Sequence, residues 1–150
     1  MPPVLVLGIG NILLRDEGVG VRVIETLGGH ELPVGVECVD GGTAGADLVD
    51  LLADRRKVIV VDAIEAGAAP GTVLRLKPED LLPDEGGMVS LHQLGLVESL
   101  HMAAQLGCSP QEVVIIAVQP KTIRPGLELS AEVQATLPRA VQAVLAELQG

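Results

Sequence analysis

The chain has 150 residues, of which 48% are hydrophobic and 20% charged, and it contains no Phe, Tyr or Trp. Its formal net charge of −10 argues against a nucleic-acid partner, because such a protein needs a cationic surplus to displace phosphate counterions. The missing aromatic rings exclude base-stacking platforms, aromatic cages and a catalytic tyrosine. The length predicts one domain over residues 1–150, with a core of aliphatic side chains.

Short β-branched runs alternate along the chain with amphipathic stretches, the pattern of an α/β protein. In chain order they predict a strand at Val4–Leu7, a helix at Gly18–Leu27, a strand at Val34–Val39, a helix at Ala46–Asp54, strands at Lys57–Val61 and Thr72–Leu76, a helix at Leu91–Leu106, a strand at Val113–Val118 and a helix at Ala131–Leu148. We expect Thr43 or Asp47 to cap the second helix and Ser130 to cap the last one.

The order of the predicted elements indicates a mixed sheet with helices on both faces. Only a short loop, turned by Pro70-Gly71, joins the third and fourth strands. A parallel crossover needs about a dozen residues or more, so the fourth strand is predicted to run antiparallel.

The apolar start of the chain, from Pro2 to Leu14, has no basic residues before it and is interrupted by Gly8, Gly10 and Asn11. These features are not typical of a signal peptide, and the run is too short to cross a bilayer. We therefore expect a cytoplasmic protein with no membrane partner.

Acidic residues and glycines follow the first three predicted strands. The segment Gly8–Gly20 carries Asp16 and Glu17, Asp40-Gly-Gly-Thr-Ala-Gly45 follows the second strand, and Asp62 ends the third. Ligands of open α/β sheets bind outside the carboxyl ends of the parallel strands, where these side chains would gather. Carboxylates brought together repel one another unless a cation neutralises them. The pattern therefore indicates a cation held by Asp16 or Glu17 together with Asp40 and Asp62.

A histidine completes this candidate site. Ser90-Leu-His-Gln93 has the form of a capping box, which would place His92 in the first turn of a helix. The helix dipole disfavours protonation there, and the neutral imidazole is the form that binds metals. Two carboxylates and an imidazole suit nickel, zinc or iron, with coordination positions left for a substrate.

Each residue of this candidate site also has a purely structural interpretation. Two acids at a helix start are typical of capping, Asp62 at a strand end is typical of an Asx-turn, and loop glycines often adopt positive φ. The pair Gly8-Ile-Gly10 is similar to the start of a dinucleotide fingerprint, with Asp40 in the place of the ribose-binding acid. Position 13 is Leu where the third glycine belongs, so a nucleotide-binding oxidoreductase is the weaker alternative.

Together, these motifs resemble those of the hydrogenase maturation endopeptidases, which process the large subunit of nickel–iron hydrogenases. The matching segments are Val6-Leu-Gly-Ile-Gly-Asn-Ile-Leu-Leu-Arg-Asp-Glu-Gly-Val-Gly20, Asp40-Gly-Gly-Thr-Ala-Gly45, Val61-Asp62-Ala63, Ser90-Leu-His92-Gln-Leu-Gly-Leu96 and Val118-Gln-Pro120. The first four occur in the family's order and spacing over the first two-thirds of the chain. The resemblance implies a three-layer α/β/α fold with a five-stranded mixed sheet whose fourth strand is antiparallel.

The resemblance also implies roles for individual residues. Glu17, Asp62 and His92 would form a metal triad that engages nickel already loaded into the hydrogenase precursor. Asp40, Glu17 and Asp62 are the candidate catalytic carboxylates. The candidate substrate-binding loop residues are Asn11, Gly41, Gly42, Thr43 and Gly45.

The expected substrate is a hydrogenase large-subunit precursor that loses a short C-terminal extension. Nickel would come with the precursor, although zinc or another divalent ion is able to occupy such a site in vitro. We expect a monomer. Two mechanisms remain open: the metal polarises the scissile carbonyl or activates water, with a carboxylate as general base, or nickel serves only as a recognition handle. A non-catalytic nickel metallochaperone with the same three ligands is the alternative function.

Overall fold

The structure, a computed structural model, describes residues 2–43, 48–81 and 91–149, with the side chains of residues 91–94 left out. The strands are β1 (Val4–Ile9), β2 (Val36–Gly42), β3 (Lys57–Ala63), β4 (Val73–Leu76) and β5 (Glu112–Val118). The α-helices are α1 (Val19–Leu27), α2 (Val49–Leu52), α3 (Leu91–Gln105) and α4 (Ala131–Leu148), and two short 3-10 helices are η1 (Arg15–Gly18) and η3 (Pro78–Leu81).

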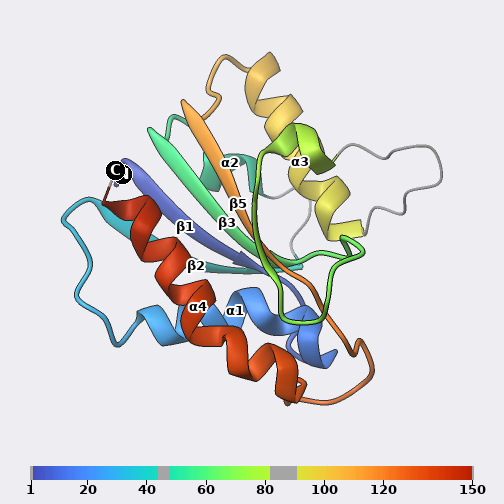
Figure 1. Ribbon diagram of the computed structural model, residues 1–150. Helices are drawn as coiled ribbons and strands as arrows, with labels where there is room; N and C mark the ends of the chain where they lie inside the picture. Colours follow the sequence, from blue (N-terminus) through green and yellow to red (C-terminus); the bar gives the residue numbers. More distant parts are fainter. Residues whose placement is uncertain (1, 44–47, 82–90, 150) are drawn as a thin grey trace.

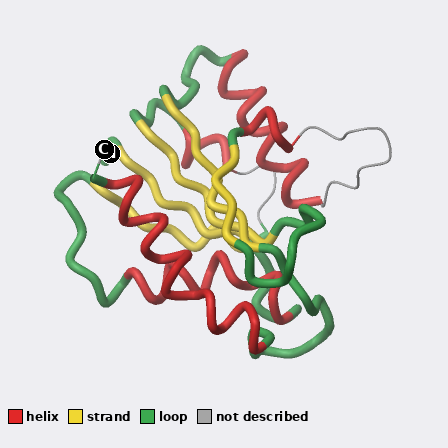
Figure 2. The backbone as a smooth tube through the Cα atoms, viewed as in Figure 1, coloured by secondary structure: helices red, strands yellow, loops and turns green. Residues whose placement is uncertain are grey.

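The five strands form one mixed sheet in the order β2-β1-β3-β5-β4. β1, β2, β3 and β5 run parallel, and β4 pairs with β5 in the antiparallel direction. Helices α1 and α4 cover one face of the sheet, and α2 and α3 cover the other (Figures 1 and 2). The predicted three-layer α/β/α fold and the antiparallel fourth strand are therefore confirmed.

An aliphatic core fills both spaces between the sheet and its helices. Along β3, Ile59 and Val61 pack on the α1/α4 side, while Val58 and Val60 pack on the α2/α3 side, and all four are fully buried. A central parallel strand buried on both faces reads as a continuous hydrophobic run, which explains the unbroken apolar sequence of β3. Val, Leu, Ile and Ala thus supply the core that the composition predicted.

Most predicted boundaries are close to the observed ones, and the differences have local causes. β2 begins at Val36 because Gly35 adopts φ +85 and Val34 is fully exposed. α2 is described only over Val49–Leu52, shorter than the predicted Ala46–Asp54, and its N-cap is Leu48 with no side-chain hydrogen bond. Leu48 is itself helical and residues 44–47 lie outside the described residues, so capping by Thr43 or Asp47 stays a prediction.

The last helix agrees with its prediction. α4 spans Ala131–Leu148, and the hydroxyl of Ser130 accepts a hydrogen bond from the amide of Val133 at 3.4 Å. Such a bond satisfies one of the amides that a helix start leaves without an intrahelical partner. Across the described part of the chain, no helix is long and apolar enough to cross a membrane.

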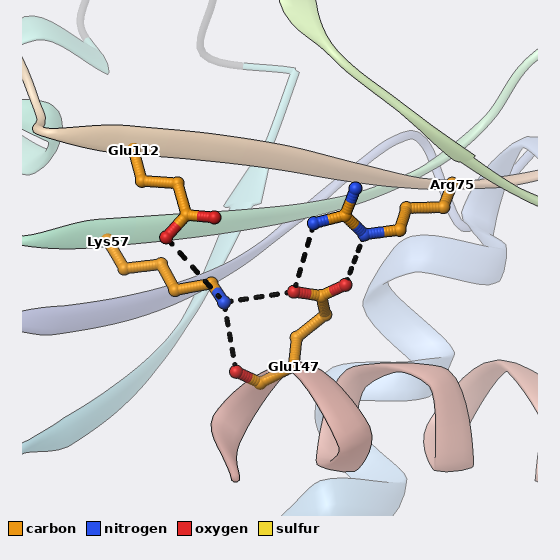
Figure 3. Close-up of polar contacts among 4 residues, drawn as sticks. All are labelled: Lys57, Arg75, Glu112 and Glu147. Atoms are coloured by element: carbon orange, nitrogen blue, oxygen red, sulfur yellow. Dashed lines mark hydrogen bonds and ion pairs between the residues drawn. The ribbon is translucent and has the colours of Figure 1, made fainter. Parts of the chain in front are cut away.

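Four charged side chains meet where the end of α4 crosses the start of β3: Lys57, Arg75, Glu112 and Glu147 (Figure 3). The buried ammonium of Lys57 donates to Glu147 Oε2 at 2.9 Å and to the Glu147 carbonyl oxygen at 3.0 Å. The guanidinium of Arg75 binds the same carboxylate. The hydrogen bond from Arg75 lowers the pKa of Glu147 below its ordinary value, and Lys57 lowers it further, while partial burial acts in the opposite direction.

We predict that Glu147→Gln lowers the free energy of unfolding at pH 7 by about 1–3 kcal/mol, because the buried Lys57 loses its charged acceptor. A carboxyl with a depressed folded-state pKa stabilises the fold above its unfolded value of 4.5, and this stability is lost as the pH falls through the folded pKa. Urea unfolding at pH 7 and in acid checks this. The difference between variant and wild type is expected to shrink in acid, and a constant difference would contradict the charge-based explanation.

Candidate functional site

Glycines allow the start of α1 to rest directly on the carboxyl edge of the sheet. A Cβ atom on Gly20 would lie 2.2 Å from the carbonyl oxygen of Val61 and 2.6 Å from that of Ile9. A Cβ on Gly10, whose φ is +139, would lie 1.9 Å from the carbonyl oxygen of Glu17. Only glycine permits such close approaches of backbone to backbone. As a result, η1, which carries Glu17, contacts β3.

Asp62 lies near the carboxyl end of β3, opposite Ala117 of β5, and is 2% exposed. Glu17 on η1 is half-buried. A carboxylate withdrawn from water attracts a cation more strongly than one in bulk solvent, because the local dielectric constant is lower. The structure therefore brings the elements that carry two of the predicted metal ligands to one edge of the sheet.

His92 lies in the first turn of α3, a helix of 15 residues. The end of α3 is tied to the amino edge of the sheet, because the Cys108 carbonyl accepts from the Asp54 amide at 2.8 Å and the Gln111 amide donates to the Arg55 carbonyl at 3.0 Å. From there the helix runs back across the sheet, and Figure 1 shows its beginning on the side where the parallel strands end. The backbone thus places His92 toward the same edge as the two carboxylates.

The side chain of His92 and the whole of Ser90 lie outside the described residues, so the contacts of the predicted triad and of the capping box are not drawn. Among the side chains that are described, no group of three His, Cys, Asp or Glu residues is arranged to hold a metal ion. The metal triad Glu17, Asp62 and His92 remains a prediction at this point.

The end of β2 presents Asp40 at the neighbouring position of the same edge. One carboxylate oxygen, Asp40 Oδ1, accepts from the amide of Gly42 at 2.8 Å, and the carbonyl of Gly42 accepts from the amide of Gly10 at 2.8 Å. Gly42 adopts φ +51, and a Cβ on Gly41 would lie 2.8 Å from Leu7 Cδ1. Glycine is therefore favoured where the chain turns beside Asp40, most clearly at Gly42, whose φ lies in the left-handed region. Unlike Asp62, Asp40 is exposed to solvent.

The other predicted loop residues are placed less completely. Asn11 shapes the turn between β1 and η1, because its Oδ1 accepts from the Leu13 amide at 2.9 Å and its carbonyl accepts from the Leu14 amide at 3.1 Å. Thr43 is exposed. Gly45 lies outside the described residues. A role for these residues in substrate binding stays a prediction.

Asp16, which the sequence left as an alternative to Glu17 in the cation site, has a different place. It is fully buried and faces the segment before α4. Its Oδ2 accepts from the amides of Lys121 and Thr122, both at 2.9 Å, and from the Ser130 hydroxyl at 2.8 Å, while its Oδ1 accepts from the Ser130 amide at 2.7 Å. Burial acts to raise the pKa of Asp16, but the amide hydrogen bonds from Ser130, Thr122 and Lys121 hold it below its ordinary value. Asp16 therefore joins η1 to the start of α4, and it caps no helix.

The sequence analysis placed Gln119 in the motif Val118-Gln-Pro120 but gave it no role; it follows β5 at the carboxyl edge and is 3% exposed. Its Oε1 accepts from the amides of Ala66 and Ala68 at 2.8 and 3.2 Å, and its Nε2 donates to Glu65 Oε2 at 2.6 Å. Gln119 thus fixes the segment that leaves β3 just after Asp62. The available signal was a polar side chain directly after an apolar strand, before Pro120.

The fold and this edge define the class: a three-layer α/β/α protein whose candidate site is built on acidic side chains and glycine-rich turns. A model of the hydrogenase maturation protease family matches residues 21–147. The chain is 40% identical over 148 residues to the hydrogenase 2 maturation protease of Escherichia coli strain K12, covering 97% of this chain and 90% of that protein.

Comparison with solved structures indicates the same family. The hydrogenase maturating endopeptidase HybD from Escherichia coli superposes with a TM-score of 0.89 at 39% identity, over 97% of this chain and 91% of that one. The nickel–iron hydrogenase maturation protease HybD from Thermococcus kodakarensis gives a TM-score of 0.78 at 25% identity, over 97% and 98%. The chain therefore belongs to the hydrogenase maturation protease family, and it is a peptidase. The family resemblance and the enzyme class predicted from the sequence are confirmed.

Proposed function

We propose that the chain removes a C-terminal extension from the large-subunit precursor of a nickel–iron hydrogenase, and that it acts on the nickel-loaded form. The names of its relatives support a role in hydrogenase maturation. The observation that carries the proposal is the contact between η1 and β3, which brings the segments bearing Glu17 and Asp62 to one edge of the sheet. Nickel is then part of the substrate, carried by the precursor.

The donor set fits such a substrate. Glu17 and Asp62 supply carboxylate oxygens, and His92 supplies an imidazole nitrogen from the first turn of α3. Imidazole is a common ligand of nickel, and a mixed carboxylate and imidazole set leaves coordination positions for the ligands that the precursor already provides. A divalent ion at such a site is able to polarise a carbonyl group.

We propose different roles for the buried and the exposed carboxylate of the site. Asp62 is buried, so it suits holding a cation, whereas Asp40 is exposed, so it is accessible to a peptide segment of another protein. The amide of Gly42 holds Asp40 Oδ1 in a fixed direction. We propose Asp40 as the acid or base that meets the scissile segment, with the neighbouring glycine-rich turn as its binding loop.

The test is incubation of the protein with nickel-loaded and nickel-free precursor, followed by intact mass measurement of the precursor. We expect a shortened large subunit from the nickel-loaded form alone. Equal shortening of both forms would overturn the nickel requirement, and no shortening of either would overturn the proposed function. Nickel transfer without shortening would favour the metallochaperone alternative.

A further inference from the structure

A second feature is a groove of about 670 Å³ that is lined by Arg15 of η1 together with residues of α1, of the start of α4 and of the segment before α4. Three leucines give it an aliphatic lining, and two arginines and two glutamates stand among them. The residues concerned are Leu127, Leu129, Leu137, Arg15, Arg22, Glu25 and Glu128. The groove is therefore amphipathic, and because its formal charges balance, any attraction for an anion depends on a guanidinium that its neighbours leave available.

Arg15 is held in the groove by an unusual backbone conformation. Its φ is +52, the left-handed region that non-glycine residues rarely adopt. The amide of Arg15 donates to the Gly126 carbonyl at 3.1 Å, and its Nε donates to the Glu128 carbonyl at 2.9 Å. Gly126 itself has φ +154, and a Cβ there would lie 3.0 Å from Arg15 Cγ. A strained residue persists only where its surroundings determine it, and such residues concentrate at binding and active sites.

The two arginines of the groove differ in what they have left to bind. Arg22 is engaged twice, by the Glu25 carboxylate at 3.1 Å and by the Leu127 carbonyl at 3.1 Å. Within the described parts of the chain, the guanidinium of Arg15 has a hydrogen-bond partner only at Nε, and Arg15 lines the groove, so its two terminal amino groups are available for an acceptor there. A guanidinium presented in this way binds a carboxylate through paired hydrogen bonds.

Apolar surface continues from the groove onto the neighbouring turn. Leu127, at the rim, is 60% exposed, and Leu13, two residues before Arg15, is 59% exposed. The bridge between Leu14 and Gly126 joins these two stretches of chain side by side. An occupant that combines an acidic side chain with aliphatic ones would match both the charge and the apolar surface.

We propose that this groove is a second docking site for the protein substrate, in which Arg15 binds a carboxylate of an acidic, leucine- or valine-rich segment of the precursor. This inference rests on the proposed function. Arg15 and Glu17 share η1, so a residue of the groove lies two positions along the chain from a candidate residue of the active site. Docking there would hold the precursor before nickel is engaged, and Arg15 would determine which precursor is accepted.

The test compares wild type with Arg15→Gln, which removes the charge and keeps a polar side chain of related length. Kd for the nickel-loaded precursor is measured by titration calorimetry, and KM and kcat are measured by intact mass. We expect Kd and KM to rise on the order of tenfold with kcat unchanged, because the lost contact is made equally in the bound and transition states. Arg15→Lys is expected to recover part of the affinity.

Arg56→Ala serves as the matched control, since Arg56 is exposed beside the amino end of β3 and its loss changes the net charge equally. Raising the salt concentration is expected to weaken binding by wild type more than by Arg15→Gln, a difference that a purely structural role of Arg15 would not produce. Unchanged Kd and KM in Arg15→Gln would overturn the docking site and leave the proposed function standing. Binding that depends on Arg15 without cleavage would support the docking site and overturn the proposed function. No binding by wild type would overturn both.

Discussion

Glu17→Gln is expected to process nickel-loaded precursor at least about tenfold more slowly than wild type, with the same thermal unfolding temperature. Loss of a side chain that merely supports a metal ligand already costs about 10- to 100-fold in affinity or activity, so loss of a ligand should cost no less. Glutamine keeps the shape of the side chain but removes its charge. The fold is expected to tolerate the change, because Glu17 is only half-buried on η1. Intact mass measured over time gives the rate, and calorimetry gives the unfolding temperature.

His92→Ala provides the independent comparison, since it removes the proposed nitrogen ligand from a different element, α3. Asp40→Asn separates the proposed roles: we expect it to slow cleavage while nickel-dependent binding of the precursor is retained. Normal processing by both Glu17→Gln and His92→Ala would remove the triad from the function. In that event Asp40 and its glycine turn would have to account for activity alone.

The fold follows from local patterns that a sequence displays directly. The apolar run of β3 predicts a strand buried on both faces, and the short connection to β4 excludes a parallel crossover. Ser130 before an amphipathic stretch predicts where α4 begins. β2 shows the limit of such patterns. Val34 is a residue type that favours strands, but it precedes Gly35, whose positive φ interrupts the extended backbone, and the strand begins only at Val36. Pairing decides a strand boundary, and propensity alone does not.

The candidate site is harder to predict from the sequence, because its two adjacent acidic residues differ only in the groups that they contact elsewhere in the fold. Asp16 and Glu17 are neighbours in one motif, and either one satisfies the sequence argument for a cation ligand. The partners of Asp16 lie 105 to 114 residues further along the chain. No local periodicity reports such contacts. The same holds for Gln119, whose role depends on the loop that follows β3.

Asp16→Asn is accordingly expected to lower the free energy of unfolding by about 3 kcal/mol at pH 7, since hydrogen bonds to a charged group contribute about 1.5–3 kcal/mol each. Both carboxylate oxygens of Asp16 accept from backbone amides: Oδ1 from Ser130, and Oδ2 from Lys121 and Thr122. Whichever way an asparagine amide turns, its NH₂ group must face at least one of these N–H donors. For a chain of this length, such a loss lowers the unfolding temperature by about 6–12 °C.

The pH dependence of the stability difference between wild type and Asp16→Asn follows from the pKa of Asp16. Hydrogen bonds hold the folded-state pKa of Asp16 below its ordinary value of 3.8, so its contribution is complete above that value and is lost as the pH falls through the lower, folded pKa. The gap between wild type and Asp16→Asn is therefore expected to be full at pH 7 and to narrow in acid. Equal unfolding temperatures at pH 7 would show that the contacts of Asp16 contribute nothing net. Glu17→Gln is the matched control: two neighbouring acids of one motif should separate, Asp16 acting on stability and Glu17 on processing, because one is enclosed by amides and the other lies at the open edge of the sheet.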